Sequence, residues 1–111
     1  MEPMINPTVL TADEMHARPE MPLGSIEGVA HRVVWQHGTS MAGRMTIVAG
    51  HHLGEHQHRR HAHHMWIVDG HVEILGAVLD AGSYVHIPPG VLHDLDARAT
   101  EGCTVFYVYT L

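Results

Sequence analysis

Residues 50–70 read GHHLGEHQHRRHAHHMWIVDG, and seven of the thirteen histidines of the chain lie between His51 and His64. Imidazole is the commonest protein ligand for Zn, Cu, Fe and Ni, so this tract is first interpreted as part of a metal site. A purification tag does not fit, because the tract is internal, has no run of six histidines, and is flanked by glycine and apolar residues in strand-like order.

The spacing of the histidines predicts which of them share a face. His56 and His58 are two residues apart, so in an extended strand their side chains point to the same side. Residues 63–68 also read as a strand, which we expect to end in a hairpin turn at Asp69-Gly70. His63 shares one face of that strand with Met65 and Ile67. If this face is the interior, His63 can join His56 and His58.

A fourth candidate lies downstream, in the sequence GSYVHIPPGVLH of residues 82–93. Pro88, Pro89 and Gly90 predict a turn. His93 follows this turn, where the chain can bend back toward the first tract. His61 has the same strand parity as His63 and is the alternative if His63 is not a ligand.

These two stretches resemble the cupins. The first cupin motif is matched by Gly50, five residues, His56-Gln57-His58, four residues, His63, six residues and Gly70. The second is matched by Gly82, five residues, Pro88-Pro89-Gly90, two residues and His93. The resemblance implies a jelly-roll β-barrel and a mononuclear metal site formed by His56, His58, His63 and His93.

The chain departs from the cupin motifs at two positions. His63 stands where the family usually has Glu, and Ala97 stands where it often has Asn. The first departure implies four neutral imidazoles in place of three histidines and a carboxylate. We therefore expect one divalent transition metal ion per chain, with Fe, Zn, Mn, Ni and Cu as candidates. Cupins that resemble this chain are commonly dimers, so a homodimer is also expected.

Short strand-like segments separated by Gly or Pro, with almost no helix, predict an all-β sandwich or barrel. Thr11 and Glu14 have the spacing of a capping box, which predicts a short helix over about residues 12–17. We expect residues 1–28 to form an N-terminal arm with this helix, and residues 29–111 to form the barrel. The expected strands are residues 29–37, 43–49, 63–68, 71–75, 77–79, 84–87 and 104–109.

Several side chains are candidates for the wall of a substrate pocket. Arg59 lies between the candidate ligands, where it could pair with a substrate carboxylate through two hydrogen bonds. The remaining candidates are Met45, His61, Met65, His86 and Tyr107, and plain core packing is the alternative interpretation of the apolar and aromatic ones. No general base can be assigned.

Composition narrows the classes of function. The chain has 111 residues, a net charge of −6 and one cysteine. These values predict a single domain with no basic patch for nucleic acid or for an anionic membrane surface. The N-terminus lacks the features of a signal peptide, and Cys103 has no partner for a disulfide, so we expect a cytoplasmic protein.

The combined interpretation is a small metal-dependent cupin enzyme that acts on a small anionic or enolisable organic molecule. We expect an oxygenase or dioxygenase. The alternatives are a non-redox isomerase, lyase, cyclase or biosynthetic bond-forming enzyme, and a non-catalytic metal- or ligand-binding module. Fold alone does not choose among these functions.

Overall fold

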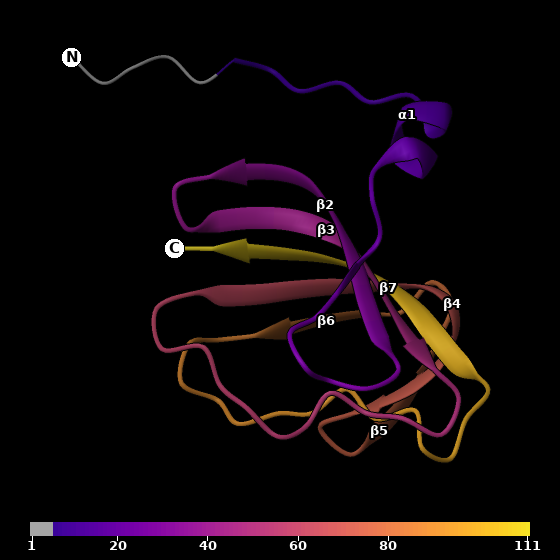
Figure 1. Cartoon of the computed structure of the whole chain (residues 1–111). Coiled ribbons are helices and arrows are strands. Elements are labelled where there is room, and N and C mark those ends of the chain that lie inside the picture. Colours follow the sequence, from indigo (N-terminus) through magenta and orange to yellow (C-terminus); the bar gives the residue numbers. More distant parts are fainter. Residues whose placement is uncertain (1–5) are drawn as a thin grey trace.

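This computed structural model describes residues 6–111, which contain one short helix and seven strands joined by irregular segments (Figure 1). The elements are α1 (Ala12–Ala17), β1 (Met21–Pro22), β2 (Val29–His37), β3 (Ser40–Val48), β4 (Ala62–Ile74), β5 (Ala77–Asp80), β6 (Tyr84–Ile87) and β7 (Gly102–Thr110). The all-β prediction and the predicted helix are both confirmed.

The predicted capping box starts α1. The Thr11 hydroxyl accepts a hydrogen bond from the Glu14 backbone amide at 3.1 Å, and the Glu14 carboxylate accepts one from the Thr11 amide at 3.3 Å. Both bonds satisfy backbone donors that the first helical turn leaves free. No helix within residues 6–111 has the length and apolar character needed to cross a membrane.

The main sheet is antiparallel, with the strand order β1-β2-β3-β7-β4, and β6 pairs with the other edge of the first half of β4. The second half of β4 leaves this sheet and pairs with β5. The order is an open path rather than a closed ring of strands. Strand β4 therefore belongs to both layers of the fold and connects them.

The second layer is completed by two irregular segments, residues 50–58 and 90–97. Their backbones pair with each other, as in the hydrogen bonds from Leu53 N to Leu95 O at 3.0 Å and from Gly50 N to Ala97 O at 2.9 Å. A bridge between Glu73 and Asp96 joins them to β4. Leu53 and Leu95 pack against side chains of the main sheet, so the hydrophobic core lies between the two layers.

The prediction of a hairpin turn at Asp69-Gly70 is wrong. Strand β4 continues through both residues, with a bulge between Ile67 and Asp69 where it pairs with β7. Gly70 has a φ of 75°, and a Cβ atom there would lie 2.0 Å from the carbonyl oxygen of Gly102. The Asp-Gly pair thus serves a bulge and a close backbone approach, which also favour glycine.

The inward face of β4 is as predicted. His63, Met65 and Ile67 are at most 2% exposed, whereas Trp66 and Val68 are more than 40% exposed. In β2 the alternation is interrupted by a register shift between Val33 and Trp35. This shift explains why neither face of residues 29–37 could be assigned as inward from the sequence.

The expected extended arm lies only partly within the described residues. Residues 6–9 are exposed and belong to no helix or strand, and residues 1–5 lie outside the described part of the chain. Strand β1, which follows α1, pairs Met21 with His31 and Pro22 with Ala30 at the edge of β2.

Candidate metal centre

Three structural elements deliver four histidines to one region of the interior. His56 and His58 come from the irregular segment before β4, His63 from the start of β4, and His93 from the segment after β6. His56 and His93 exchange two backbone hydrogen bonds of 2.9 Å. The amide of Gly90 also donates to the carbonyl of His58 at 2.8 Å, so the Pro-Pro-Gly turn is fixed beside the first motif.

The rings of His56, His58 and His93 converge. Ring centres are 4.2 Å apart for His56 and His93, 5.1 Å for His56 and His58, and 5.6 Å for His58 and His93. One ring nitrogen from each of the three residues lies within 4.8 Å of the other two. This spacing suits three side chains that bind one metal ion. If the ion were zinc, each bond from a histidine nitrogen to the ion would be about 2.0 Å long.

Hydrogen bonds to the backbone orient two of these rings. His56 donates from Nδ1 to the Gly54 carbonyl at 2.7 Å, and His93 donates from Nδ1 to the Val91 carbonyl at 3.0 Å. A neutral imidazole that donates from Nδ1 carries its lone pair on Nε2. Nε2 of His93, like Nε2 of His58, is buried and has no hydrogen-bond partner within residues 6–111. Buried nitrogens without partners are costly, and a metal ion would satisfy them.

His63 is adjacent to this group. Its side chain is 0% exposed, and neither ring nitrogen has a hydrogen-bond partner in the described part of the chain. Its ring centre lies 5.3 Å from that of His58 and 5.6 Å from that of His93. Its nitrogens do not belong to the converging group of three. The structure thus brings His63 next to the other three rings as a buried imidazole free to bind.

Burial favours the neutral form of three of these imidazoles. Burial first, and the neighbouring histidines second, lower the pKa of His63 to about 2 and that of His58 to about 4. Burial also lowers the pKa of His93. A histidine must be neutral to bind a metal, so the site is prepared for an ion at neutral pH.

Asp94 connects two segments of the site, a role that no pattern in the sequence predicted. Its carboxylate accepts hydrogen bonds from Nδ1 of His52 at 2.7 Å and from the amide of Gly54 at 2.8 Å. Gly54 is also the residue whose carbonyl orients His56. Asp94 therefore connects the segment that carries His93 to the segment that carries His56.

A pocket of about 280 Å³ opens onto His56 and His58. Tyr109 forms one wall, and its ring centre lies 4.6 Å from that of His58 and 4.2 Å from that of His63. The opposite side consists of apolar residues that sequence reasoning missed, because they come from loops without periodicity: Leu23, Ile26 and Leu53.

The other pocket candidates lie in different places. Met45, Met65 and Tyr107 are core residues with at most 1% exposure, and none lines this pocket. Arg59 is exposed and does not line it either. His61 contacts the Thr39 hydroxyl at 2.9 Å. His86 is exposed on the outer face of the sheet, where its ring stacks on His64.

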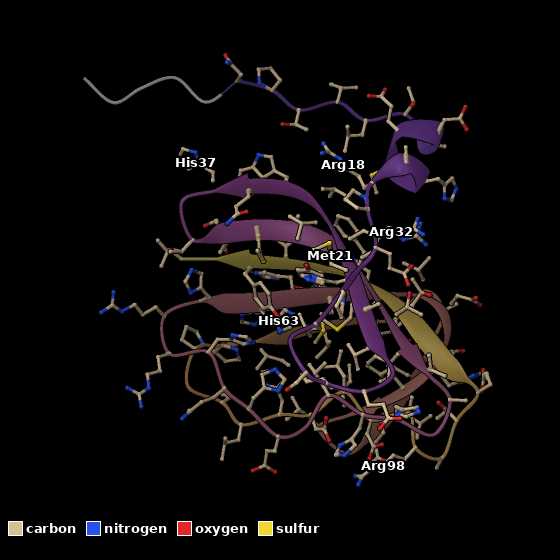
Figure 2. The ribbon with its side chains drawn as sticks, viewed as in Figure 1. Arg18, Met21, Arg32, His37, His63 and Arg98 are labelled. Atoms are coloured by element: carbon tan, nitrogen blue, oxygen red, sulfur yellow. The ribbon has the colours of Figure 1, made fainter. Side chains whose placement is uncertain are left out.

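Figure 2 shows His63 among the strands, close to the middle of the molecule, while the labelled arginines lie at its periphery.

The side chains around the site are imidazoles and the phenol of Tyr109. Burial raises the pKa of Tyr109, so its hydroxyl stays protonated at neutral pH and can donate a hydrogen bond into the pocket.

The sequence matches no protein-family model, and no curated protein matches it. Solved structures do match. An RmlC-like cupin from Shewanella frigidimarina is 23% identical, with a TM-score of 0.71 over 85% of this chain and 84% of that one. A protein of unknown function with a cupin-like fold from Ralstonia eutropha is 22% identical, with a TM-score of 0.77 over 96% of this chain and 73% of that one.

A third similar structure is the polyketide cyclase RemF from Streptomyces resistomycificus. It is 12% identical, with a TM-score of 0.76 over 96% of this chain and 79% of that one. Identities this low establish the fold and leave the reaction open. With its two β layers, its two motif segments paired through His56 and His93, and these structural neighbours, the chain has the cupin fold.

Proposed function

We propose that the protein is a mononuclear transition-metal enzyme that oxidises a small enolisable organic molecule with O2. One observation carries the proposal: His56 and His58 line an apolar pocket, and Nε2 of His58 is buried without a hydrogen-bond partner among residues 6–111. Ligand pockets typically combine apolar walls with a few polar groups that fix orientation, and this pocket has that composition.

His56, His58 and His93 would hold the metal, and His63 would be the fourth ligand. Four neutral imidazoles favour Fe, Zn, Ni or Cu, with Mn as a harder alternative. A bound ion of this kind supplies Lewis acidity and, if it is redox-active, the capacity to react with O2. The hydrogen bonds from His56 to Gly54 and from His93 to Val91 fix which ring nitrogen faces the ion.

The remaining pocket residues would position the substrate. The Tyr109 hydroxyl can donate a hydrogen bond to a carbonyl or enolate oxygen, because burial keeps it protonated. Leu23, Ile26 and Leu53 would cover the apolar part of the substrate and exclude water. A molecule that fits would be small, largely apolar, and equipped with one or two oxygen atoms.

One side chain of the pocket is placed to act as a base toward an enolisable substrate. Among residues 6–111, Glu55 is the only acidic residue that lines the pocket, and no arginine lines it. Glu55 is exposed at the edge of the pocket, where its carboxylate could accept the proton lost when a ketone forms its enolate.

The test begins with protein purified without an affinity tag. Metal analysis should find about one transition metal per chain, because the structure offers one converging histidine group. A panel of small enolisable ketones and keto acids is then assayed with an oxygen electrode. We expect O2 uptake that stops when a chelator removes the metal, and a large loss of activity in Tyr109→Phe at unchanged metal content.

Turnover that proceeds equally well without O2 would overturn the oxygenase assignment and indicate Lewis-acid chemistry. The similarity to a polyketide cyclase makes that outcome worth testing directly. Metal binding without turnover of any substrate in the panel would instead support a non-catalytic module.

We expect the enzyme to work in the cytoplasm. Cys103 is buried, and burial raises the pKa of its thiol to about 11, so it is held as an unreactive thiol. A reducing compartment suits a chain with a single cysteine of this kind.

A further inference from the structure

Two arginines lie side by side on the outer face of the main sheet. Arg32 in β2 and Arg44 in β3 are direct partners in the antiparallel register, so their side chains emerge side by side on one face. Like charges placed directly opposite each other destabilise a sheet. Such a pair requires compensation by a nearby negative charge.

Only one of the two arginines has this compensation within residues 6–111. Arg32 forms an ion pair with Glu20 at 3.3 Å and donates a second hydrogen bond to the His16 carbonyl, also at 3.3 Å. In the same part of the chain, Arg44 has neither an ion pair nor a side-chain hydrogen bond. Its guanidinium retains its donors for an additional acceptor.

A pocket of about 190 Å³ lies against both guanidinium groups. Residues from α1, the segment after it and three strands of the sheet contribute its polar lining: His16, Glu20, His31, Arg32, Arg44, Thr46 and Thr104. None of them lines the pocket at the metal centre. In Figure 2, Arg32 lies beside the α1 end of the molecule, well separated from His63.

We infer that this second pocket binds the carboxylate group of a small molecule. Two guanidinium groups and the Glu20 carboxylate sum to one net positive charge, which matches one carboxylate. Arg44 can offer two parallel N–H donors, the geometry that carboxylates accept best. The hydroxyls of Thr46 and Thr104 add donors at the same place. The whole chain has a net charge of −6, so the attraction is local to this pocket.

The experiment titrates sodium acetate into the protein as purified, with ionic strength held constant by NaCl. The chain has six basic residues, all of them arginines, so its arginine Nε–Hε NMR signals are few and the Arg44 signal can be identified by its absence in Arg44→Gln. We expect the Arg44 signal to shift in a saturable way. At about tenfold excess over the dissociation constant, the Tm should rise by roughly 5 °C.

Matched variants distinguish this site from the metal centre. Arg44→Gln should abolish the rise in Tm, and in acetate-free buffer it should be at least as stable as the wild type, because it removes the like-charge pair. Glu20→Gln should bind acetate several-fold more tightly, because it removes the competing carboxylate. Arg60→Gln, which removes an exposed charge near the histidine tract, should behave as the wild type.

The inference is overturned if the Arg44 signal does not move, if NaCl alone reproduces the effect, or if Arg60→Gln abolishes it equally. It is also overturned if Arg44→Gln changes the sedimentation of the protein and acetate has no effect. That result would assign the arginine pair to a contact between two copies of the chain.

Discussion

Two backbone hydrogen bonds join His56 to His93. The backbone amide of each residue donates to the carbonyl of the other at 2.9 Å, and their ring centres are 4.2 Å apart. The two residues come from segments with little regular secondary structure. Their pairing is part of the layer that closes the core opposite the main sheet. Binding of a metal by both rings would therefore also stabilise this layer, because an ion that binds only the folded state adds to folding free energy.

The first prediction concerns metal content. The double substitution His56→Ala and His58→Ala removes two of the three converging rings, so metal content should fall from about one ion per chain to nearly zero. Elemental analysis after dialysis measures this. The wild type should also lose several degrees of Tm when a chelator removes its metal, whereas the double variant should show no such loss.

A matched control keeps the number of removed histidines constant. His37 and His86 are both exposed and lie outside the cluster, so the double substitution His37→Ala and His86→Ala should retain full metal content. If the two double variants lose metal equally, the ion is held by scattered surface histidines.

The second prediction concerns the stability of the metal-free protein at low pH. The pKa of His63 is about 2 in the folded state against an ordinary 6.5, so between these values the unfolded chain binds more protons. The free energy of unfolding should therefore fall as pH falls below about 6.5, with a slope approaching 1.4 kcal/mol per pH unit from His63 alone. Burial of His58 and His93 acts in the same direction.

Urea denaturation between pH 4 and 7 measures this slope. His63→Gln should reduce it by about one proton. His71→Gln is the control: the hydrogen bond between His71 and Glu101 raises the pKa of His71 and lowers that of Glu101, so the slope between about pH 4.5 and pH 6.5 should not change. A wild-type stability independent of pH over this range would contradict the burial of neutral imidazoles.

Strand alternation and motif spacing predicted from the sequence which residues of β4 point inward. They correctly placed His63 with Met65 and Ile67, because a strand that packs against a core must alternate. They could not reveal that Asp69-Gly70 is a bulge. The same dipeptide suits a hairpin turn, and only the distant backbone of Gly102 distinguishes the two.

The residues that form the pocket wall could not be predicted from the sequence, for a related reason. Leu23, Ile26 and Leu53 lie in loops, where no periodicity indicates which side chains turn inward. His86 and Arg59 illustrate the converse, because proximity in sequence to the motifs suggested a role in the pocket. Strand pairing places His86 opposite His64 on the outer face, and Arg59 is exposed.

The third prediction concerns the bulge at Gly70. In Gly70→Ala the new Cβ would lie 2.0 Å from the Gly102 oxygen, and the residue would also have to keep a φ of 75°. Gly38→Ala shares the positive φ, at 58°, but has no atom within 4 Å of the new Cβ. We expect Gly38→Ala to cost about 1 kcal/mol of unfolding free energy and Gly70→Ala roughly 3 kcal/mol or more. Equal losses in chemical denaturation would show that the backbones of β4 and β7 separate easily.

The fourth prediction concerns assembly. Trp66 and Tyr84 are 43% and 49% exposed, lie on the outer face of the sheet and have ring centres 5.1 Å apart. Domains of this size bury a modest fraction of their surface, so covering this aromatic face would add stability. We expect sedimentation velocity to give a dimer, and Trp66→Glu to weaken it.

Val78→Glu is the control for assembly, since Val78 is 65% exposed on β5 and lies away from the aromatic pair. It should leave the dimer intact. A wild-type protein that sediments as a monomer at about 100 µM would refute the prediction, because an interface of standard size holds together well below that concentration.

The last prediction decides between His63 and His61 as the fourth ligand. His63 is buried with both ring nitrogens unpartnered, whereas Nε2 of His61 already contacts the Thr39 hydroxyl at 2.9 Å. We therefore expect His61→Ala to keep its metal and His63→Ala to bind it at least tenfold more weakly. His63→Glu should retain metal, because a carboxylate can replace the imidazole, and its added negative charge should improve the tolerance of Mn relative to Cu. Metal stoichiometry for the three variants, measured side by side, provides the answer. If His61→Ala empties the site and His63→Glu changes neither content nor preference, His63 is a packing residue beside a site completed by His61.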